Sequence, residues 1–399
     1  MPEESTVEAV PGEFTIEPIA EMPGASTLWL VVDGEKVSRT GIIPYTLRIG
    51  RATVRMDGIG GVATPEDHRN KGYSRRVLAE AVERMKAGDA LLTSLYGIPH
   101  YYPRWGYATA AHEGGIRLTR LDADTTMPEG LRLRAAHAGD LPRIRTLYAD
   151  GTRTLIGAAV RDDDGLVWTE LVTAIAEGRD ECRVVVDETD EVLAYAWTAS
   201  FIWWMKNMTR DDPDGFHIGE AFAMTPRAAD ALLAGLRAWA AEAGKAHADL
   251  HQPAVGALGM AARLQDTAML TVTFRDAQFM ARSTGTVALI AALEEELRDR
   301  WLGSRLGWSG ILRIVADGEA AAIALTPETL DVLPEGSAPE GLSDAIEVEL
   351  TPGELARLAL GSFPPLDLLD RIGVARDIAD VLAVLFPERR PYIYPADRF

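Results

Sequence analysis

A basic, glycine-bearing loop carries the clearest chemical signal in this sequence. Residues 62–75 read Val-Ala-Thr-Pro-Glu-Asp-His-Arg-Asn-Lys-Gly-Tyr-Ser-Arg. A strand-like run precedes the loop and an amphipathic pattern follows it, so Gly72 stands where a helix is expected to begin. Open amides and the positive end of the helix dipole bind anions there, and a glycine lets a pyrophosphate approach the backbone. Because Arg69, Lys71 and Arg75 add positive charge, the loop predicts an anionic ligand rather than an ordinary basic turn.

A second segment, Pro99–Tyr107, concentrates aromatic side chains. It contains the adjacent tyrosines Tyr101 and Tyr102, followed by Trp105. A tyrosine hydroxyl with an ordinary pKa near ~10 is protonated at neutral pH and can donate its proton in catalysis. The alternative for either tyrosine is simple packing beside Trp105.

Together the two segments resemble the GNAT acetyltransferases. Val62–Ser74 is similar to the acetyl-CoA motif of that family, Arg/Gln-x-x-Gly-x-Gly/Ala after a strand, with Ser74 replacing the second small residue. The resemblance implies that the loop amides bind the pyrophosphate and that the strand Val62–Thr64 pairs with the pantetheine arm. The residues assigned in this way to acetyl-CoA are Val62, Ala63, Thr64, Arg69, Asn70, Lys71, Gly72, Tyr73, Ser74, Arg75, Gly97 and Ile98; no metal is expected.

The aromatic segment is similar to a second GNAT motif, aromatic-Tyr-x-x-aromatic-Gly-aromatic. The resemblance aligns Tyr102 with the general acid that protonates the departing thiolate. Tyr101 is the close competitor, because it is adjacent and chemically identical. His100 is expected to be a wall of the pocket, and the motif supplies no clear general base.

The strands and helices around these motifs indicate an α/β (α+β) protein of three regions. Residues 1–125 are expected to form an N-terminal catalytic domain, with strands at Thr27–Val32, Ile43–Ile49, Ala52–Met56, Ala90–Leu95 and Gly115–Leu118 and a helix at Gly72–Ala87. Residues 126–284 restart the same layout, and Leu121–Gly130 is a predicted linker. Residues 285–399 have another order, from a helix at Val287–Trp301 to a helix capped by Thr351 and opened by Pro352.

The bulk composition restricts the partners. The 399 residues include 40 basic and 60 acidic side chains, for a formal charge of −20. This charge argues against nucleic acid and favours a cationic or amine-bearing substrate, although acidity also serves solubility alone. A single cysteine and the lack of a signal peptide or long apolar run predict a cytoplasmic protein without a membrane partner.

The whole layout resembles the Eis (enhanced intracellular survival) branch of the GNAT family. Two GNAT-like regions are followed by a segment, 351–363, similar to the Gly-ended helix of a sterol-carrier-protein-like domain. The tail Tyr394–Phe399 is similar to the Phe-terminated Eis tail, and the resemblance implies that the terminal carboxylate of Phe399 acts as the base. It also implies a homohexamer, for which the cluster Trp203–Met205 is either an interface or the end of a core strand. The proline and aromatic residues of Pro391–Phe399 favour a docked tail.

Departures from the Eis pattern limit what can be transferred. Few residues precede Val62, so the two helices that usually follow the first GNAT strand are shortened or absent, and no substrate residues are assigned. The segment Met224–Asp230 lacks a glycine-rich loop, which predicts a non-catalytic central copy. The leading hypothesis is acetylation of primary amines on an aminoglycoside- or polyamine-like molecule. The alternatives are acetylation of protein lysines and a non-catalytic CoA- or lipid-sensing scaffold.

Overall fold

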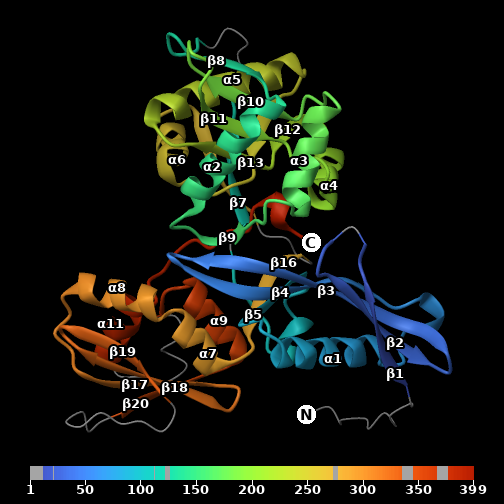
Figure 1. Cartoon of the computed structure of the whole chain (residues 1–399), viewed down its shortest axis with the longest axis vertical. Coiled ribbons are helices and arrows are strands. Elements are labelled where there is room, and N and C mark those ends of the chain that lie inside the picture. The colour runs from blue at the N-terminus through green and yellow to red at the C-terminus, as the bar shows by residue number, and fades with distance from the viewer. Residues whose placement is uncertain are drawn as a thin grey trace.

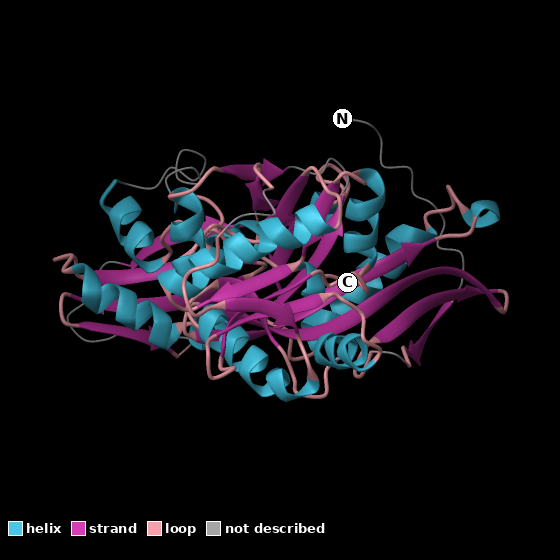
Figure 2. Cartoon of the chain, turned by 90° about the horizontal axis from the view of Figure 1, so that it is seen from above, coloured by secondary structure: helices cyan, strands magenta, loops and turns pink. Residues whose placement is uncertain are grey.

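The computed structural model describes residues 12–20, 22–111, 113–121, 126–272, 277–334, 345–365 and 376–399, which form two lobes (Figure 1). The central region makes up the upper lobe. The N-terminal and C-terminal regions lie side by side in the lower lobe, and the C-terminus returns to the junction between the lobes. Seen from above, long strands run through the middle of the molecule with helices on both sides (Figure 2). No helix in the described part of the chain has the length and apolar character to cross a membrane.

The first sheet carries both sequence motifs. Its strands follow the order β1-β2-β3-β4-β5-β16-β6, and β9 pairs with a separate part of β3. The strands are β1 (Glu13–Pro18), β2 (Ser26–Val32), β3 (Glu35–Ile49), β4 (Ala52–Ala63), β5 (Leu92–Gly97), β6 (Ala108–Thr109), β9 (Ile156–Val160) and β16 (Gln278–Ser283). In the described residues 12–20 and 22–63 no helix separates these first strands, as the shortness of this segment predicts.

Helix α1 (Tyr73–Ala87) covers one face of the first sheet. Its three-four spacing of apolar residues predicts a single buried stripe. The buried residues are Tyr73, Val77, Leu78, Ala81, Val82 and Met85. They pack against Ile59 of β4 and Leu95 of β5, which therefore point toward α1. The turns η1 (Glu66–His68) and η2 (Tyr102–Trp105) lie before α1 and after β5.

The upper lobe contains two joined sheets. Their orders are β13-β11-β10-β8 and β12-β14-β7-β15. Strands β12 (Gly215–Ile218) and β13 (Glu220–Ala223) follow each other with only Gly219 between them, so one run of chain joins the sheets. The remaining elements are β7 (Glu113–Leu118), β8 (Arg132–Ala135), η3 (Ala138–Asp140), α2 (Leu141–Thr152), α3 (Leu166–Ala176), β10 (Cys182–Val186), β11 (Val192–Trp197), α4 (Trp203–Asp211), α5 (Pro226–Glu242), β14 (His247–Leu250), α6 (Gly256–Arg263) and β15 (Thr267–Val272).

The two halves exchange one strand each. In the first half β4 pairs parallel with β5, and the inserted β16 runs antiparallel between β5 and β6. In the second half β12 pairs parallel with β14, and the inserted β7 runs antiparallel between β14 and β15. Because β7 follows β6 in the chain and β16 follows β15, each half donates its last strand to the other. The halves are therefore two copies of one plan that cannot separate without breaking both sheets.

The C-terminal region packs on the face of the first sheet opposite α1. It contains α7 (Thr286–Ala292), α8 (Glu294–Ser304), β17 (Gly310–Ala316), β18 (Glu319–Thr326), β19 (Thr329–Leu333), β20 (Ala345–Leu350), α9 (Pro352–Leu360), α11 (Arg376–Leu385) and η4 (Pro395–Asp397). Val54 and Met56 of β4 share one core with residues of these elements, such as Leu312 and Leu355. Thr351 caps α9 as expected, and Glu354 completes a capping box. The likeness of the C-terminal region to a sterol-carrier-protein-like domain remains a prediction.

Two local predictions are wrong. The expected helix Val287–Trp301 is two helices, α7 and α8, because Leu293 ends the first and three glutamates open the next, where the helix dipole favours negative charge. Trp203–Met205 does not end a strand but begins α4, with Trp203 exposed and Met205 buried. The expected linker Leu121–Gly130 lies partly outside the described residues. The domain limits at 125 and 284 stay predictions, and paired strands cross both.

Candidate active site

Strands β4 and β5 separate at the centre of the first sheet. Their pairing runs from Met56 opposite Leu92 to Ile59 opposite Leu95 and ends there. Both strands continue, β4 to Ala63 and β5 to Gly97. Gly61, in a left-handed conformation (φ +58°), lies where the register with β3 also shifts, which bends β4 away from β5. An edge of β4 that includes Val62 and Ala63 is left without a neighbouring strand, and an extended amide-bearing arm can pair with it.

The helix start at the end of this groove is open. Gly72 precedes α1 with φ +76°, and a side chain there would meet no atom within 4 Å. No side chain caps the helix. Asn70 also has a positive φ (+61°), so the tight turn uses two left-handed residues. This geometry leaves room in front of the first amides of α1 for a phosphate group.

The cations of the loop have no ion-pair partner in the part of the chain that the structure describes. Arg69, Lys71 and Arg75 are exposed, and no carboxylate among the described residues lies within ion-pair distance of them. Arg69 donates a hydrogen bond to the carbonyl of Thr64 (3.3 Å), which ties the loop to β4. The Thr64 hydroxyl lies 2.9 Å from that of Ser38 on β3. In a protein of formal charge −20, an uncompensated basic cluster at a helix start fits an anionic ligand.

The two candidate tyrosines have different surroundings. The Tyr101 hydroxyl lies 2.9 Å from the Ser74 hydroxyl, so it is engaged with the start of α1. Tyr102 is partly buried on η2, and its hydroxyl forms no hydrogen bond with a described residue. Burial, and secondarily Tyr101, raises the pKa of Tyr102 above its usual value, so the group remains a proton donor at neutral pH. His100 is exposed.

Because Gly97 has no side chain, the Tyr102 ring can pack against the end of β5 beside the groove. A Cβ at Gly97 would lie 2.4 Å from the Tyr102 ring. Gly97 has the same side-chain direction as Leu95 on β5, so Tyr102 lies on the α1 face of the sheet. The carbonyl of the next residue, Ile98, accepts a hydrogen bond from the Tyr101 amide (3.0 Å) and closes the turn.

The C-terminal tail is docked at the same groove from the other face. The Phe399 ring lies over β4, where a Cβ at Gly58 would come within 2.3 Å of it. It packs near Tyr45 and Tyr96, with ring centroids 5.6 and 5.9 Å away. The carboxyl carbon of Phe399 lies 3.9 Å from the position of a Cβ on Gly60. Tyr102 and Phe399 therefore flank the separation of β4 and β5 from opposite faces of the sheet.

A cavity of about 910 Å³ opens at Phe399 between the lobes. Its lining combines rings and carboxylates, including Tyr45, Tyr96, Trp204, Asp162, Asp164 and Phe399. Arg55, Arg161 and Arg398 also line it, but each pairs with a buried carboxylate, Arg55 with Asp57, Arg161 with Asp397 and Arg398 with Glu113. Asp162 and Asp164 form no ion pair with a described residue. The cavity therefore presents negative charge beside aromatic surfaces, which suits a cationic molecule.

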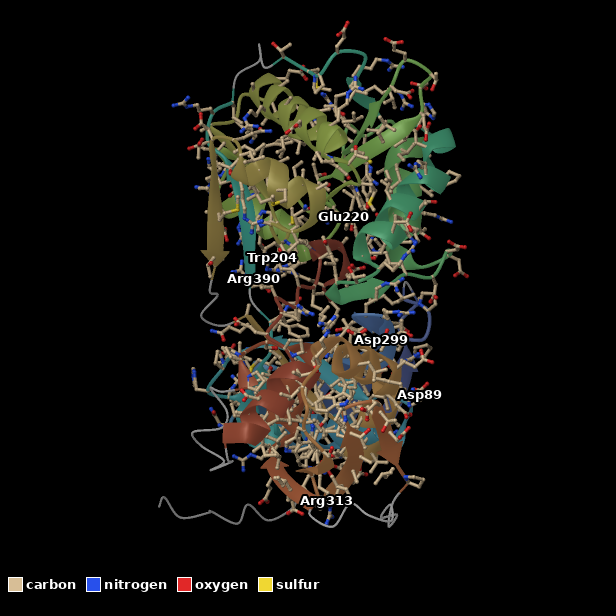
Figure 3. The ribbon with its side chains drawn as sticks, turned by 90° about the vertical axis from the view of Figure 1, so that its left-hand side faces the viewer. Asp89, Trp204, Glu220, Asp299, Arg313 and Arg390 are labelled. Atoms are coloured by element: carbon tan, nitrogen blue, oxygen red, sulfur yellow. The ribbon has the colours of Figure 1, made fainter. Side chains whose placement is uncertain are left out.

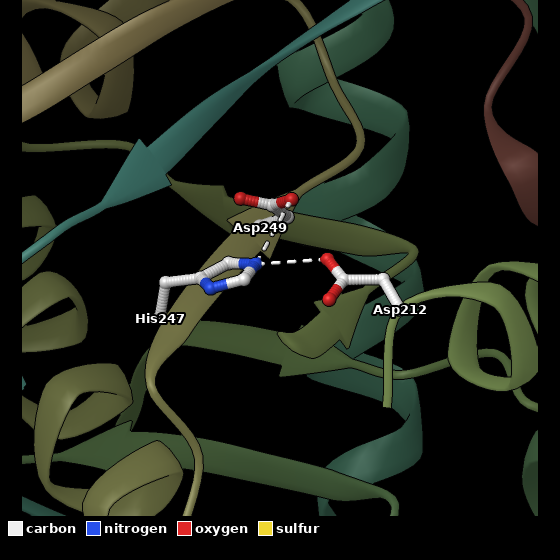
Figure 4. Close-up of side chains that lie close together, drawn as sticks. All are labelled: Asp212, His247 and Asp249. Carbon is white, nitrogen blue, oxygen red and sulfur yellow. Dashed lines mark hydrogen bonds and ion pairs between the residues drawn. The ribbon is translucent and has the colours of Figure 1, made fainter. Parts of the chain in front are cut away.

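A second cluster of ionisable side chains lies in the upper lobe (Figure 4). Asp212, His247 and Asp249 bring one potential metal-ligand atom each within 4.8 Å of the others. His247 is bonded to Asp212 (2.9 Å), and Arg117 donates to both oxygens of Asp249 at 2.7 and 2.6 Å. Since a guanidinium already neutralises Asp249, the geometry is that of an ion-pair network rather than of a metal centre.

Comparisons with known proteins point to the same family as the two sequence motifs. Residues 13–110 match the family described as acetyltransferase (GNAT) domain. No curated protein sequence matches the chain. A GCN5-related N-acetyltransferase from Kribbella flavida is similar in structure, with TM-score 0.65, 17% identity, and coverage of 94% of this chain and 88% of that one. Eis1 from Mycobacterium abscessus is similar with TM-score 0.60, 16% identity, and coverage of 96% and 93%.

A third similar structure is a probable N-acyltransferase from Enterococcus faecalis. It has TM-score 0.68 and 14% identity, and the match covers 96% of this chain and 93% of that one. At these identities the likeness concerns the fold, and it extends over nearly the whole chain. The protein therefore carries a GNAT acetyltransferase domain at residues 13–110, within a fold that resembles Eis1 as the sequence motifs predicted.

Several residues at the groove are invisible to sequence reasoning. Gly58 and Gly60 make room for Phe399, and Arg161 and Glu113 hold the tail. None of them belongs to a motif, because each acts on a residue distant in the chain. The signal in the sequence was the proline and aromatic residues of Pro391–Phe399, which favour docking but do not reveal its partners.

Proposed function

We propose that this protein transfers the acetyl group of acetyl-CoA to a primary amine on a cationic small molecule. The observation that carries the proposal is the groove between β4 and β5, with an open, basic helix start at one end and Tyr102 and Phe399 on its two faces. The assigned loop residues fit acetyl-CoA, since Gly72 leaves space before the amides and the edge of β4 is unpaired. Bound acetyl-CoA would supply the thioester whose C–S bond breaks.

The residues of the chain would then handle two protons. The terminal carboxylate of Phe399 holds the substrate ammonium and takes one proton from it, which frees the lone pair that forms the new C–N bond. The nitrogen loses its second proton to solvent as the C–S bond breaks. Tyr102 donates its proton to the sulfur that departs, and solvent restores both groups. A terminal carboxylate has an ordinary pKa near ~3.5, so it is a weak base unless desolvated. Phe399 is partly buried and its ring packs near Tyr45 and Tyr96, and this partial enclosure of the chain end supports such a role.

The shape of the cavity supports a small acceptor. Its walls come from both lobes and include the chain end, so the amine must enter a confined space of about 910 Å³. A polyamine or an amino sugar fits this volume and the surplus of carboxylates. A lysine of a folded partner protein would need to insert its side chain past the exposed Trp203 at the lining.

The test measures free thiol released from acetyl-CoA in the presence of a panel of amines and lysine peptides. We expect release with polyamines and amino sugars and little with peptides. Deletion of Phe399 should lower kcat about 100-fold while the affinity for acetyl-CoA changes little, because the loop is untouched. No thiol release above background with any acceptor would refute acetyl transfer, and full activity without Phe399 would refute its role.

Two wider expectations belong to the same proposal. The homohexamer rests on resemblance to Eis proteins alone, and a mass determination in solution by light scattering tests it. The cytoplasmic location rests on the single cysteine, Cys182, and fractionation of cells that express the full chain tests it.

A further inference from the structure

A buried ion-pair network holds the residue two positions before the chain end. Arg161 donates to both oxygens of Asp397, from Nε at 2.8 Å and from Nη2 at 3.0 Å. The opposite side of the guanidinium pairs with Glu220, which also accepts a hydrogen bond from the Tyr195 hydroxyl at 2.5 Å. The side chains of Arg161, Asp397 and Glu220 are 4%, 4% and 0% exposed. Each charge is therefore fixed by direct contacts rather than by solvent.

The position of Arg161 is set by the catalytic sheet. It directly follows β9, which belongs to the central region but pairs with β3 of the first sheet. In that register Val160 lies opposite Thr46, so Arg161 follows next to Tyr45, whose ring packs near Phe399. Its guanidinium also lies 3.8 Å from the ring centroid of Tyr148 on α2. Strand β9 thus places the Arg161 guanidinium in the wall of the cavity, in the same lining as Tyr45 and Phe399.

The neighbouring residue of the tail has its own anchor. Arg398 pairs with Glu113, the first residue of the exchanged strand β7, and lies 4.0 Å from the Trp204 ring centroid. Its Nε also donates to the carbonyl of Ile393 at 3.2 Å. Figure 3 shows Glu220 and Trp204 in the upper lobe, near the C-terminal segment where the lobes meet. Two successive residues before Phe399 are therefore held by the central half of the fold.

We propose that Arg161, Asp397 and Glu220 are positioning residues that fix the terminal carboxylate of Phe399 at the groove. This inference rests on the proposed function, because it assumes that the carboxylate acts on the amine. A chain end normally frays, and ordering it costs about 1–2 kcal/mol per residue in backbone entropy. A bidentate carboxylate–guanidinium pair restricts Asp397 in both distance and direction. Only two residues separate Asp397 from the carboxylate, so its position passes directly to the chain end.

The network also gives the central half a role in catalysis. Glu220 comes from β13 and Tyr148 from α2 in the upper lobe, and Arg161 follows β9, a strand of the central region that pairs with β3 of the first sheet. Arg161 pairs with Glu220 on one side of its guanidinium and with Asp397 on the other. A rotation of Arg161 away from this position would therefore leave at least one of these buried carboxylates without its ion pair. The central half, which lacks a cofactor loop, therefore supplies the residues that position the terminal carboxylate of Phe399, the base proposed for the first half.

The first test replaces Asp397 by Asn, which removes the charge and one acceptor but keeps the volume. Arg161 retains Glu220 in this variant, so the fold keeps a paired cation. We expect kcat with a polyamine to fall about 10- to 100-fold and the KM for acetyl-CoA to stay the same, because a misplacement of about 1 Å can cost 100-fold. The control is Asp163→Asn, two residues after Arg161. The Asp163 side chain is 90% exposed, and its one ion pair with a described residue is with Arg145. This substitution should change neither quantity.

The second test separates positioning from a general loss of structure. An amine that is unprotonated at neutral pH does not need the carboxylate to take its proton. Asp397→Asn should therefore slow transfer to a polyamine but change transfer to such a low-pKa amine less than 2-fold, and the defect with the polyamine should shrink as pH rises toward the pKa of that amine. Equal losses with both amines would overturn the inference, because a damaged fold slows both.

The third test asks whether Asp397 acts through the chain end. One extra glycine at the C-terminus moves the carboxylate by about 3.8 Å. In this extended chain Asp397→Asn should have little further effect on kcat, while in the natural chain it has its full effect. Additive losses would show that Asp397 acts elsewhere and would overturn the inference. If no acceptor releases thiol from acetyl-CoA, the proposed acetyl transfer fails. If deletion of Phe399 leaves kcat unchanged, the role of its carboxylate as the base fails and the positioning role fails with it; if deletion lowers kcat and Asp397→Asn does not, only the positioning role fails.

Discussion

The two halves of the sheet system share one strand plan but differ at the start of the following helix. In the first half, Gly72 precedes α1 in a left-handed conformation and no side chain caps the helix. In the second half, Thr225 precedes α5 and its hydroxyl accepts a hydrogen bond from the Ala228 amide at 3.2 Å, with Pro226 in the first turn. One helix start stays available for a phosphate, whereas the other satisfies its own amides.

The strand edges that lead to these two helix starts also differ, since the edge in the first half is open and the edge in the second half is occupied. Beyond Ile59 the edge of β4 has no partner strand. In the second half, the strand edge beyond β12 is occupied, because the Gln252 side chain accepts a hydrogen bond from the Ala221 amide at 2.7 Å. Gln252 is buried. A side chain therefore takes the place where a cofactor arm would pair, which supports the proposal that the central half is a non-catalytic copy.

The difference teaches that one backbone plan can serve catalysis or support according to a few residues at its strand and helix ends. The central half has closed its own groove and contributes Arg161 and Glu220 to the tail. Strand exchange keeps the halves in fixed register. Four substitutions test this division, and the largest effect is expected at the tyrosine of the open groove.

Tyr102→Phe should lower kcat about 100-fold or more, because it removes the proton donor for the thiolate. The affinity for acetyl-CoA should stay nearly unchanged, as measured by titration calorimetry with CoA. Tyr101→Phe is the matched control, since its hydroxyl bonds to Ser74 at the helix start, and it should change kcat by less than about 5-fold. A larger loss of kcat in Tyr101→Phe than in Tyr102→Phe would mean that Tyr101, and not Tyr102, is the proton donor.

The same tyrosine predicts the alkaline limb of the pH profile. A general acid works in its protonated form, and burial raises the pKa of Tyr102 above its usual value. The tyrosine-dependent part of kcat should therefore persist up to and beyond about pH 10 and fall only above it. A fall in kcat near neutral pH that disappears in Tyr102→Phe would contradict this.

Gly72→Ala should weaken acetyl-CoA binding about 10-fold, because an added Cβ strains this left-handed position and takes up part of the open space next to the helix start, which no protein atom occupies within 4 Å. The control is Gly244→Ala after α5, where φ is +68° and a Cβ also meets nothing within 4 Å. Both variants should lose about 1–2 kcal/mol of unfolding free energy through the same backbone strain. Only the first should alter the Kd for CoA, and equal effects on Kd would break the contrast between the halves.

Gln252→Ala should destabilise the fold by about 1–3 kcal/mol, because it leaves the buried Ala221 amide without an acceptor. The KM for acetyl-CoA should not change, since the second groove has no open basic loop. Urea unfolding and initial rates measure the two quantities. A gain of a second CoA site in this variant, seen as a stoichiometry above one, would show that the side chain alone closes the groove.

Thr225→Ala should have the smallest effect. Loss of the cap of α5 costs about 1 kcal/mol of unfolding free energy and should leave kcat and the KM for acetyl-CoA unchanged. Thermal unfolding followed by circular dichroism measures the loss. A change in KM would mean that the start of α5 communicates with the cofactor loop, contrary to the comparison.

The sequence alone determined the parts of this protein whose chemistry is local. A loop with Gly72 and three cations before an apolar helical stripe forms an anion site wherever it folds, because neighbours in the chain supply amides, dipole and charge. The apolar stripe of α1, the cap of α9 at Thr351 and most strands could be predicted for the same reason. The order of Tyr102 after the loop was also enough to predict a GNAT acetyltransferase domain, which residues 13–110 match.

Only the tertiary structure decided which distant residues meet. No spacing in the chain reveals that β7 and β16 change places, since antiparallel strands with alternating or apolar patterns fit either sheet. The tail motif predicted docking, but the partners Gly58, Arg161 and Glu113 depend on register and exchange. A terminal carboxylate gains a defined place only when a packed interior has fixed the residues before it, and packing between segments far apart in sequence is what local patterns cannot specify.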